Sequence, residues 1–183
     1  YLAYFSPSYV KAGICGAHRG LSRLLEQGAR AACIVGRFED AYAARHLEAA
    51  LVAQSGIVET MRASKKEELL CEQRYDFAET LEVFARVLDG LGHREEIHGA
   101  GFAPEEPIDL SRYYFAGPSL AHDRLQRVDD AGGIASGLCV GMVGSSIVFE
   151  QVGALFVVSL KDWESHEVEL VEGAVLREYD FKP

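Results

Sequence analysis

The sequence predicts an α+β fold, with a β-β-α-β-α domain and trailing helices over residues 1–98 and a β-rich domain over residues 99–183. Three observations predict it: aromatic and β-branched runs open the chain, leucines then recur at helical spacing, and after Gly99 glycine and proline separate short apolar runs. The hydrophobic fraction of 49% and the charged fraction of 25% are those of an ordinary globular protein. A chain of this length can bury a sizeable core.

The first two strands form a predicted hairpin. Tyr1–Phe5 and Tyr9–Cys15 are strand-like runs, and Ser6-Pro7-Ser8 separates them. Proline favours a turn there because it cannot continue a strand ladder. Tyr4 is expected on the opposite face of its strand from Tyr1, since strand side chains alternate.

The helices of the first domain are predicted from leucine spacing and from end signals. Residues 16–27 carry leucines three and four apart, and Gly28 is a natural helix stop. A third strand is expected over Ala31–Val35, and a helix with an acidic start near Glu39 runs to about Gln54. Two further helices are predicted, Met61–Cys71 and Phe77–Leu91.

The remainder of the chain is predicted to be rich in strands. The expected strands are Ile134–Val143, Ile147–Gln151, Ala154–Leu160 and His166–Val171. In the last of these, apolar and acidic residues alternate, as in a half-buried antiparallel strand. The glycines of residues 137–144 precede no predicted helix, so we expect bulges or tight corners there and not a phosphate-binding loop.

Charge is distributed unevenly along the chain. The net charge is −10, which argues against a polyanionic partner for the chain as a whole. Residues 1–38 nevertheless hold five cationic residues against one glutamate, a local net charge of +4. We therefore expect nucleic acid to bind through residues 1–60, and a protein partner to bind through the acidic C-terminal region. The arginines expected to contact nucleic acid outside any reaction centre are Arg19, Arg30 and Arg37.

Several classes of protein are excluded or disfavoured. The longest apolar runs are far shorter than the roughly 20 residues that cross a bilayer, so no membrane span is expected. The four cysteines form no CxxC pair and the six histidines show no ligand spacing, so neither a zinc site nor a disulfide framework is predicted. Reduced cysteines, serving as small buried apolar residues, suit a cytoplasmic location.

The hairpin carries a more specific pattern. Tyr1-Leu2-Ala3 followed by Val10-Lys11-Ala12-Gly13 resembles the paired GIY and YIG elements of the GIY-YIG nuclease superfamily. Tyr1 stands twelve residues before Gly13, a separation typical of that hairpin, and Gly13 occupies the third position of the second element. Lys11 departs from the family pattern because it takes the place of the second tyrosine.

Two residues on the following helices extend the resemblance. The superfamily has an arginine eight to ten residues after that glycine, and Arg23 stands ten after it, with Arg19 as the less favoured match. The superfamily also has a metal-binding glutamate on the next helix, and Glu48 stands at the matching position. Glu48 is about 100° round the helix from the buried stripe of Leu47, so it can flank a groove.

The resemblance implies a metal-dependent nuclease, and the matched residues suit that chemistry. Glu48 would hold Mg²⁺ or Mn²⁺, and Arg23 would brace the phosphate with its bidentate guanidinium. Tyr1 would act as general base or orient the water, with Lys11 as the cationic neighbour that a tyrosine needs in order to ionise. Gly13 is the structural glycine of the set, and its alternative role is to permit close packing against the hairpin.

Three segments together resemble one uncharacterised prokaryotic family, a domain of unknown function: residues 10–14, 26–29 and 137–144. The resemblance is tight up to about Glu48 and looser beyond it. Members of that family carry a cysteine-rich, zinc-binding segment ahead of the domain. Because no methionine precedes Tyr1, we expect such a segment to be missing here, and zinc is expected only in that segment.

Three functions remain open on the sequence. The first is a metal-dependent endonuclease or phosphodiesterase. The second is a catalytically inactive module of the same fold that binds nucleic acid or protein, in which Tyr1 is an ordinary strand aromatic and Arg23 and Glu48 are surface charges. The third is a small-molecule enzyme that uses the β-rich part, which supplies Tyr113, Tyr114, His122 and Trp163. Convergence of Tyr1, Lys11, Arg23 and Glu48 on one concave surface would favour the first.

Overall fold

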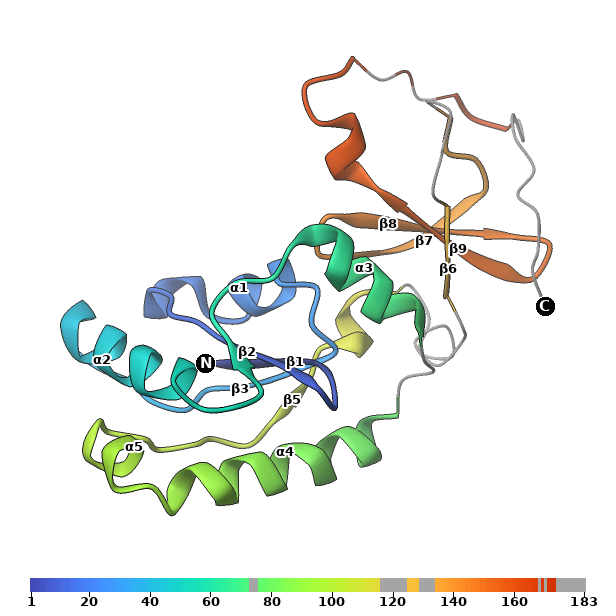
Figure 1. Ribbon diagram of the computed structural model, residues 1–183. Helices are drawn as coiled ribbons and strands as arrows, with labels where there is room; N and C mark the ends of the chain where they lie inside the picture. The colour runs from blue at the N-terminus through green and yellow to red at the C-terminus, as the bar shows by residue number, and fades with distance from the viewer. Residues whose placement is uncertain (73–75, 116–124, 129–133, 168, 170, 174–183) are drawn as a thin grey trace.

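The computed structural model describes residues 1–72, 76–115, 125–128, 134–167, 169 and 171–173, and it has the mixed α+β architecture expected from the sequence. A five-stranded sheet with its helices forms one lobe, and a four-stranded sheet forms a second lobe above it (Figure 1). The strands are β1 (Leu2–Ser6), β2 (Tyr9–Ala12), β3 (Ala31–Cys33), β4 (Ile57–Val58), β5 (Ile108–Asp109), β6 (Leu125–Arg127), β7 (Leu138–Val143), β8 (Ser146–Gln151) and β9 (Ala154–Ser159). The α-helices are α1 (Gly20–Glu26), α2 (Ala41–Val52), α3 (Ala63–Glu72), α4 (Phe77–Gly92) and α5 (Glu95–Gly99), and the 3₁₀ helices include η1 (Ala17–Arg19), η2 (Ser111–Tyr113) and η4 (Leu160–Trp163).

The first sheet is mostly antiparallel and has the strand order β4-β2-β1-β3-β5. The predicted hairpin is confirmed, because β1 and β2 pair antiparallel with Leu2 opposite Ala12. Strand β4 adds to β2 in parallel, and β5 adds to β3 antiparallel. Because β5 lies after Gly99, the first sheet draws on the chain beyond the expected boundary at residue 98.

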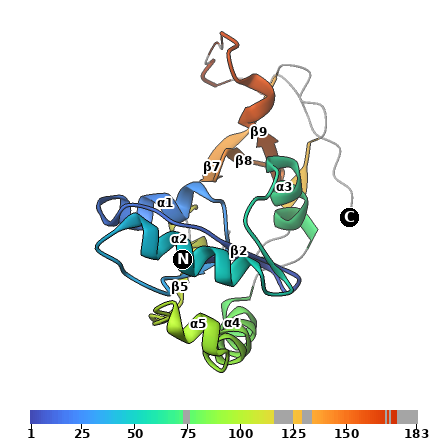
Figure 2. The same cartoon turned by 60° about the vertical axis from the view of Figure 1, so that its left-hand side comes forward.

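Strand β1 lies at the centre of this sheet and is buried on both faces. Tyr1, Ala3 and Phe5 belong to one hydrophobic core, which continues through α1 and α3 into the second sheet. Leu2 and Tyr4 belong to the other, which packs against α2, α4 and α5. The predicted opposition of Tyr1 and Tyr4 is therefore confirmed. In both views α4 and α5 lie below the sheet, while α3 and the second sheet lie above it (Figure 2).

The helices follow their local signals with one exception. Asp40 and Asp76 cap α2 and α4, each carboxylate accepting hydrogen bonds from two main-chain N–H groups, which stabilises such a helix by about 1 kcal/mol. The helix predicted over residues 16–27 is instead divided into η1 and α1 at Gly20, whose φ of +43° is outside the helical range. No helix in the described residues is long and apolar enough to cross a bilayer.

The second sheet has the order β6-β9-β8-β7, with β6 parallel to β9. The bulge expected in residues 137–144 occurs between Cys139 and Gly141. A Cβ on Gly141 would lie 2.3 Å from the carbonyl oxygen of Tyr114, so only glycine allows this close approach. The strand predicted at 166–171 is absent from the residues described there, and Val168 and Leu170 lie outside them.

Several contacts join the second sheet to the first lobe. Tyr114, which follows η2, accepts a hydrogen bond from the Met142 N–H of β7 at 2.9 Å and donates one from its hydroxyl to the carbonyl oxygen of Ala29 at 2.7 Å. At the β7–β8 turn, a Cβ on Gly144 would lie 3.1 Å from the Cα of Gly28. Both glycines have positive φ, +70° at Gly28 and +59° at Gly144, so their backbones meet without intervening side chains.

Candidate functional site

Tyr1 and Gly13 meet at the open end of the first hairpin. The main-chain nitrogen of Tyr1 donates to the Gly13 carbonyl at 2.8 Å, and the Gly13 N–H donates to the Tyr1 carbonyl at 3.1 Å. A Cβ on Gly13 would lie 2.6 Å from both Cζ and Oη of the Tyr1 ring. The ring therefore lies directly over Gly13, and this glycine has a structural role because any side chain would displace the phenol.

The Tyr1 hydroxyl is buried and has no partner at ordinary hydrogen-bond distance among the described residues, although the Arg23 guanidinium lies near enough to interact with it. Leaving a buried polar atom without a partner costs about 1–3 kcal/mol, and such atoms often mark functional positions. Burial raises the pKa of this hydroxyl, and the positive charge of Arg23 opposes that rise without cancelling it. Desolvation is thus the larger effect on the pKa of Tyr1 and disfavours its ionisation, and the role of Tyr1 as a general base stays a prediction.

Lys11 lies on β2 beside Tyr1. Its Nζ is 5.8 Å from the centre of the Tyr1 ring and donates to the Ala12 carbonyl at 3.3 Å. Burial lowers the pKa of Lys11, the charge of Arg23 lowers it further, and Glu48 opposes both. The charges of Arg23 and Glu48 therefore both act on Lys11.

Arg23 projects from α1, where its Nη1 donates to Glu26 Oε2 at 3.2 Å. Arg19 binds the same carboxylate. The side chain of Arg23 remains about one-third exposed, and its charge acts on both Tyr1 and Lys11. Arg23 is therefore oriented by one exposed carboxylate while its charge reaches the end of the hairpin.

Glu48 is carried by α2 and is half-buried. Its neighbours on the helix, Leu47 and Leu51, are buried in the core below the first sheet and hold α2 against it. No ion pair or hydrogen bond engages the Glu48 carboxylate within the described chain. This carboxylate is thus available to a ligand.

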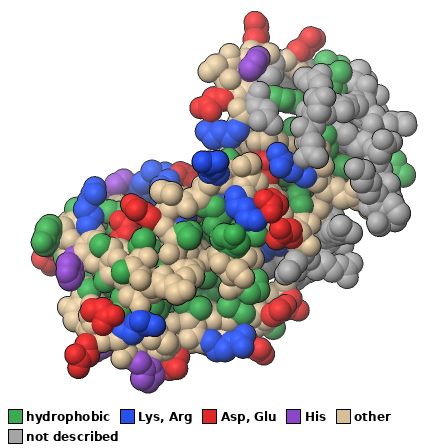
Figure 3. All heavy atoms as spheres, viewed as in Figure 1, with side chains coloured by type: hydrophobic (Ala, Val, Ile, Leu, Met, Phe, Trp, Pro, Cys, Tyr) green, Lys and Arg blue, Asp and Glu red, His purple; other side chains and the backbone are tan. Residues whose placement is uncertain are grey.

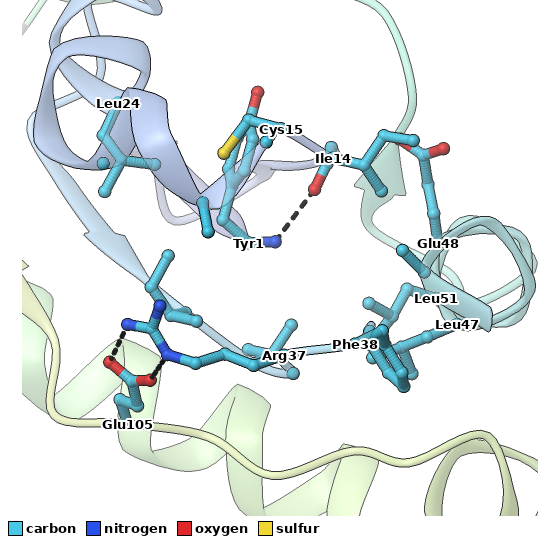
Figure 4. Close-up of a pocket in the computed structure, with 18 of the residues that line it drawn as sticks. Tyr1, Ile14, Cys15, Leu24, Arg37, Phe38, Leu47, Glu48, Leu51 and Glu105 are labelled. Atoms are coloured by element: carbon cyan, nitrogen blue, oxygen red, sulfur yellow. Dashed lines mark hydrogen bonds and ion pairs between the residues drawn. The ribbon is translucent and has the colours of Figure 1, made fainter. Parts of the chain in front are cut away.

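A cavity of about 250 Å³ opens at this end of the sheet. Figure 4 shows Tyr1, Cys15 and Leu24 on one side of it, and Phe38, Leu47, Glu48 and Leu51 on the other. Arg37 and Glu105 form a bidentate ion pair at a third side, with N–O distances of 2.5 and 3.1 Å (Figure 4). The floor of the cavity is therefore apolar, and Glu48 is its one lining carboxylate without a cationic partner in the described chain.

The four residues singled out in the sequence share one neighbourhood but not one cavity. Tyr1 and Glu48 line the cavity, whereas Arg23 lines a separate cleft on the other side of α1. Lys11 lines neither, yet its charge couples to Arg23 and Glu48. Their catalytic roles stay predictions.

The other arginines expected to bind nucleic acid are engaged within the protein. Arg19 pairs with Glu26, and Arg37 pairs with Glu105. Arg30 donates to the Leu70 carbonyl at 2.5 Å and is partly buried. The expected burial of the cysteines holds for Cys33. Cys71 is partly buried, and Cys15 and Cys139 are exposed.

Other groups considered in the sequence form no second centre. The described residues contain no cluster of three or more His, Cys, Asp or Glu side chains that would hold a metal ion. Of the residues offered for a pocket in the β-rich part, Tyr114 is buried and bonded to Ala29, and Tyr113 contacts Arg112 at the surface. His122 lies outside the described residues.

Comparison with known families identifies the chain. Residues 1–168 match the family described as "Protein of unknown function (DUF2797)". The chain belongs to the DUF2797 family. No curated protein and no solved structure matches it. The expected membership of a family of unknown function is confirmed, and the fold described above gives this DUF2797 member its candidate site.

One important residue of this DUF2797 member escaped the sequence reasoning. Lys66 on α3 is half-buried and lines the cleft beside Arg23. A signal was present, since Leu69 and Leu70 follow Lys66 by three and four positions and are both buried. That spacing indicates that Lys66 lies on the inward face of its helix.

Proposed function

We propose that this chain is a divalent-metal-dependent nuclease of the GIY-YIG type, which hydrolyses phosphodiester bonds in DNA or RNA. One observation carries the proposal: the buried Tyr1 hydroxyl has the Arg23 guanidinium and the Glu48 carboxylate in its neighbourhood, Lys11 lies beside the Tyr1 ring, and no cation engages Glu48 in the described chain. The order of the first strands and helices, β-β-α-β-α, agrees with the fold that the resemblance implies. The residues concerned are Tyr1, Lys11, Arg23 and Glu48.

Tyr1 orients the attacking water in this proposal. Because burial raises its pKa, the phenol is neutral at pH 7 and does not take the proton of the water. A neutral phenol still donates and accepts hydrogen bonds, which suffices to align a water with phosphorus. The water oxygen forms the new bond to phosphorus and loses its proton to solvent, while the bond to the leaving oxygen breaks.

Arg23 and Lys11 stabilise the negative charge that accumulates on the phosphate. The guanidinium can contact two phosphate oxygens at once and is always charged. Lys11, half-buried beside the Tyr1 ring, adds positive charge at a position partly shielded from water. Electrostatic stabilisation of this kind is usually the largest contribution to catalysis.

Glu48 would hold the metal ion. Mg²⁺ commonly keeps several waters and binds through one or two carboxylates together with phosphate oxygens, so a single carboxylate without a cationic partner fits it better than a cage of protein ligands. When bound, the ion supplies Lewis-acid stabilisation of the leaving oxygen.

The test is cleavage of labelled DNA and RNA, single-stranded, duplex and branched, with Mg²⁺ or Mn²⁺. We expect Glu48→Ala to lower the cleavage rate by roughly 10²–10³-fold while leaving binding in EDTA unchanged. Glu39→Ala is the matched control, because Glu39 is exposed just before the same helix and does not line the cavity. Absence of cleavage, or equal rates for Glu48→Ala and the wild type, would contradict the proposal.

A catalytically inactive module that binds nucleic acid is the second candidate. Three observations favour it: Lys11 replaces a tyrosine of the superfamily pattern, the pKa of Tyr1 is raised and not lowered, and Tyr1, Lys11, Arg23 and Glu48 do not line one cavity. This candidate requires salt-dependent binding that Arg23→Ala weakens, with no dependence on metal and no cleavage of any substrate.

A further inference from the structure

A second hollow lies where the two lobes meet. It is a cleft of about 340 Å³ between the end of α1, the start of α3 and the β7–β8 turn. Three cationic side chains line it, one from each of α1, α3 and η4: Arg23, Lys66 and Lys161. In Figure 3 lysine and arginine side chains gather on this face at the junction of the lobes. The cleft is distinct from the Tyr1 cavity and shares no lining residue with it.

Lys66 is the central cation of the cleft. Its Nζ donates to the Gln27 carbonyl at 2.9 Å and lies 5.4 Å from the centre of the Phe5 ring. No carboxylate lies within ion-pair distance of it in the described chain. Among the residues that the structure describes, its close partners are thus a neutral carbonyl and an aromatic ring, which is unusual for a half-buried ammonium group.

The surrounding charges leave Lys66 uncompensated. Burial lowers its pKa to about 8, and the positive charges of Lys11 and Arg23 add to this effect. The one buried carboxylate in the cleft, Glu67, accepts a hydrogen bond from Ser146 at 2.9 Å and lies 3.7 Å from Arg127. Glu67 is therefore already satisfied. Arg23 pairs with Glu26 and Lys161 pairs with Glu164, both at the exposed rim, so Lys66 is the lining cation without an ion pair in the described chain.

The cleft has a rigid edge. Gly28 follows the end of α1, Gly144 forms the β7–β8 turn, and their backbones are in direct contact. Ser145, beside Gly144, also lines the cleft and carries a hydroxyl and a main-chain N–H, both of which are donors. Cations from two lobes and hydroxyl donors beside them suit the tetrahedral oxygens of a phosphate group.

We propose that this cleft is a subsite for a backbone phosphate of the bound nucleic-acid strand, next to the phosphate that is cleaved. The inference rests on the proposed function for the identity of the ligand. Arg23 joins the two places, since it lines the cleft and its charge also acts on the Tyr1 hydroxyl. A strand held by Lys66 and Lys161 would present its neighbouring phosphate to Arg23 and the reaction centre.

The experiment measures oligonucleotide binding by the full 183-residue chain in EDTA over a series of salt concentrations. Each phosphate contact contributes about 0.7–0.9 to the slope of log affinity against log salt. Lys66→Gln is expected to weaken binding by about fivefold or more. It should also lower the slope by about 0.7–0.9, the contribution of one phosphate contact. Lys161→Gln, at a side chain that is 53% exposed, repeats the test at a position where the fold is not at risk.

Lys65→Gln is the matched control. Lys65 precedes Lys66 but pairs with Glu68 at 2.6 Å and lines neither hollow. We expect its binding and salt slope to equal those of the wild type. Equal slopes for all three variants, or no binding by the wild type, would overturn the subsite.

Cleavage in Mg²⁺ is measured separately on the same variants. A wild type that binds with the expected slope changes but never cleaves supports the subsite and contradicts the nuclease. A wild type that cleaves, while Lys66→Gln and Lys161→Gln bind as well as Lys65→Gln, supports the nuclease and contradicts the subsite.

Discussion

Helix α1 separates two hollows of different character. Its residues Gly20, Leu21 and Leu24 line the cavity beside Tyr1, whereas Arg23 and Glu26 line the cleft at the junction of the lobes. The cavity has an apolar floor, and its one arginine is paired with Glu105. The cleft has cations from three elements, and its central one, Lys66, has no ion pair in the described chain.

If the proposed function holds, this difference divides the labour between the two hollows. The apolar cavity with one available carboxylate would select by shape and coordination, whereas the cleft around Lys66 would attract a phosphate backbone irrespective of its bases. Changes in the cavity should therefore alter turnover, and changes in the cleft should alter binding and its salt dependence. Arg23, whose charge reaches both, should alter both.

Among the variants, Arg23→Ala is expected to have the largest effect, because it should change both cleavage and binding. Cleavage should fall by roughly 10²–10³-fold and binding by roughly tenfold, because one substitution removes charge from the reaction centre and from the cleft. Arg23→Lys should restore binding but not cleavage, since lysine keeps the charge and loses the bidentate fork.

Arg86→Ala is the control, because Arg86 is exposed on α4 and lines neither hollow, so both quantities should equal those of the wild type. Single-turnover cleavage and anisotropy titrations measure the two effects separately. If Arg23→Ala changed only one of the two quantities, the cavity and the cleft would be independent.

Gly13→Ala should affect the cavity alone. The new methyl group would lie 2.6 Å from the Tyr1 ring, so the ring must move. We expect cleavage to fall by about tenfold or more, binding to stay unchanged, and the free energy of unfolding to fall by about 1–3 kcal/mol.

Gly90→Ala is the comparison variant, because it should raise the free energy of unfolding where Gly13→Ala lowers it. Gly90 lies within α4 with no atom near the added Cβ, so alanine should stabilise the helix by about 0.5–1 kcal/mol. Urea unfolding of both variants measures these changes. Full activity of Gly13→Ala would show that the position of the Tyr1 ring is unimportant.

The smallest expected effect is a pH dependence of binding that arises from the titration of Lys66 in the cleft. Lys66 loses its proton in the free protein as the pH rises through about 8, so phosphate affinity should fall roughly severalfold between pH 7 and 9. A bound phosphate favours the protonated form, so binding should be accompanied by proton uptake near pH 8. The charged groups around Lys66 come from five elements: Lys11, Arg23, Glu26, Glu67, Arg127 and Lys161.

Lys66→Gln should bind with a nearly flat profile between pH 7 and 9, whereas Lys65→Gln should keep the wild-type profile. The pKa of Lys65 is raised by its hydrogen bond with Glu68, so this lysine stays charged throughout that range. Anisotropy titrations in EDTA at constant ionic strength measure the affinities. A Lys66→Gln profile as steep as that of the wild type would assign the titration to another group.

The elements that the sequence predicted well are those specified by local patterns. The first hairpin, α2, α4 and strands β7 to β9 follow from alternation, leucine spacing and capping residues. The two-residue strands β4 and β5 were missed, because their identity depends on partners far away in the chain, β2 and β3. The strand predicted at 166–171 is not formed at residues 166, 167, 169 and 171, where alternation alone does not provide a partner.

The sequence singled out residues that lie near one another, and their roles stay predictions, but it did not predict their electrostatics. Family spacing singled out Tyr1, Arg23 and Glu48, which do lie in one neighbourhood. Spacing could not show that burial of Tyr1 outweighs its cationic neighbours, because desolvation depends on the folded surroundings. Lys66 was missed for the same reason, since its uncompensated charge becomes visible only when α1, α3 and the β7–β8 turn come together.

The contact between Gly28 and Gly144 has a consequence for the evolution of this family. The two positions are far apart in the sequence, yet a side chain at either one would push the two lobes apart and widen the cleft. A larger residue at one position therefore cannot be compensated by any change at the other, because glycine is already the smallest choice. We expect relatives that keep Lys66 and Lys161 to keep both glycines, and relatives that lose one glycine to have lost the lysines as well.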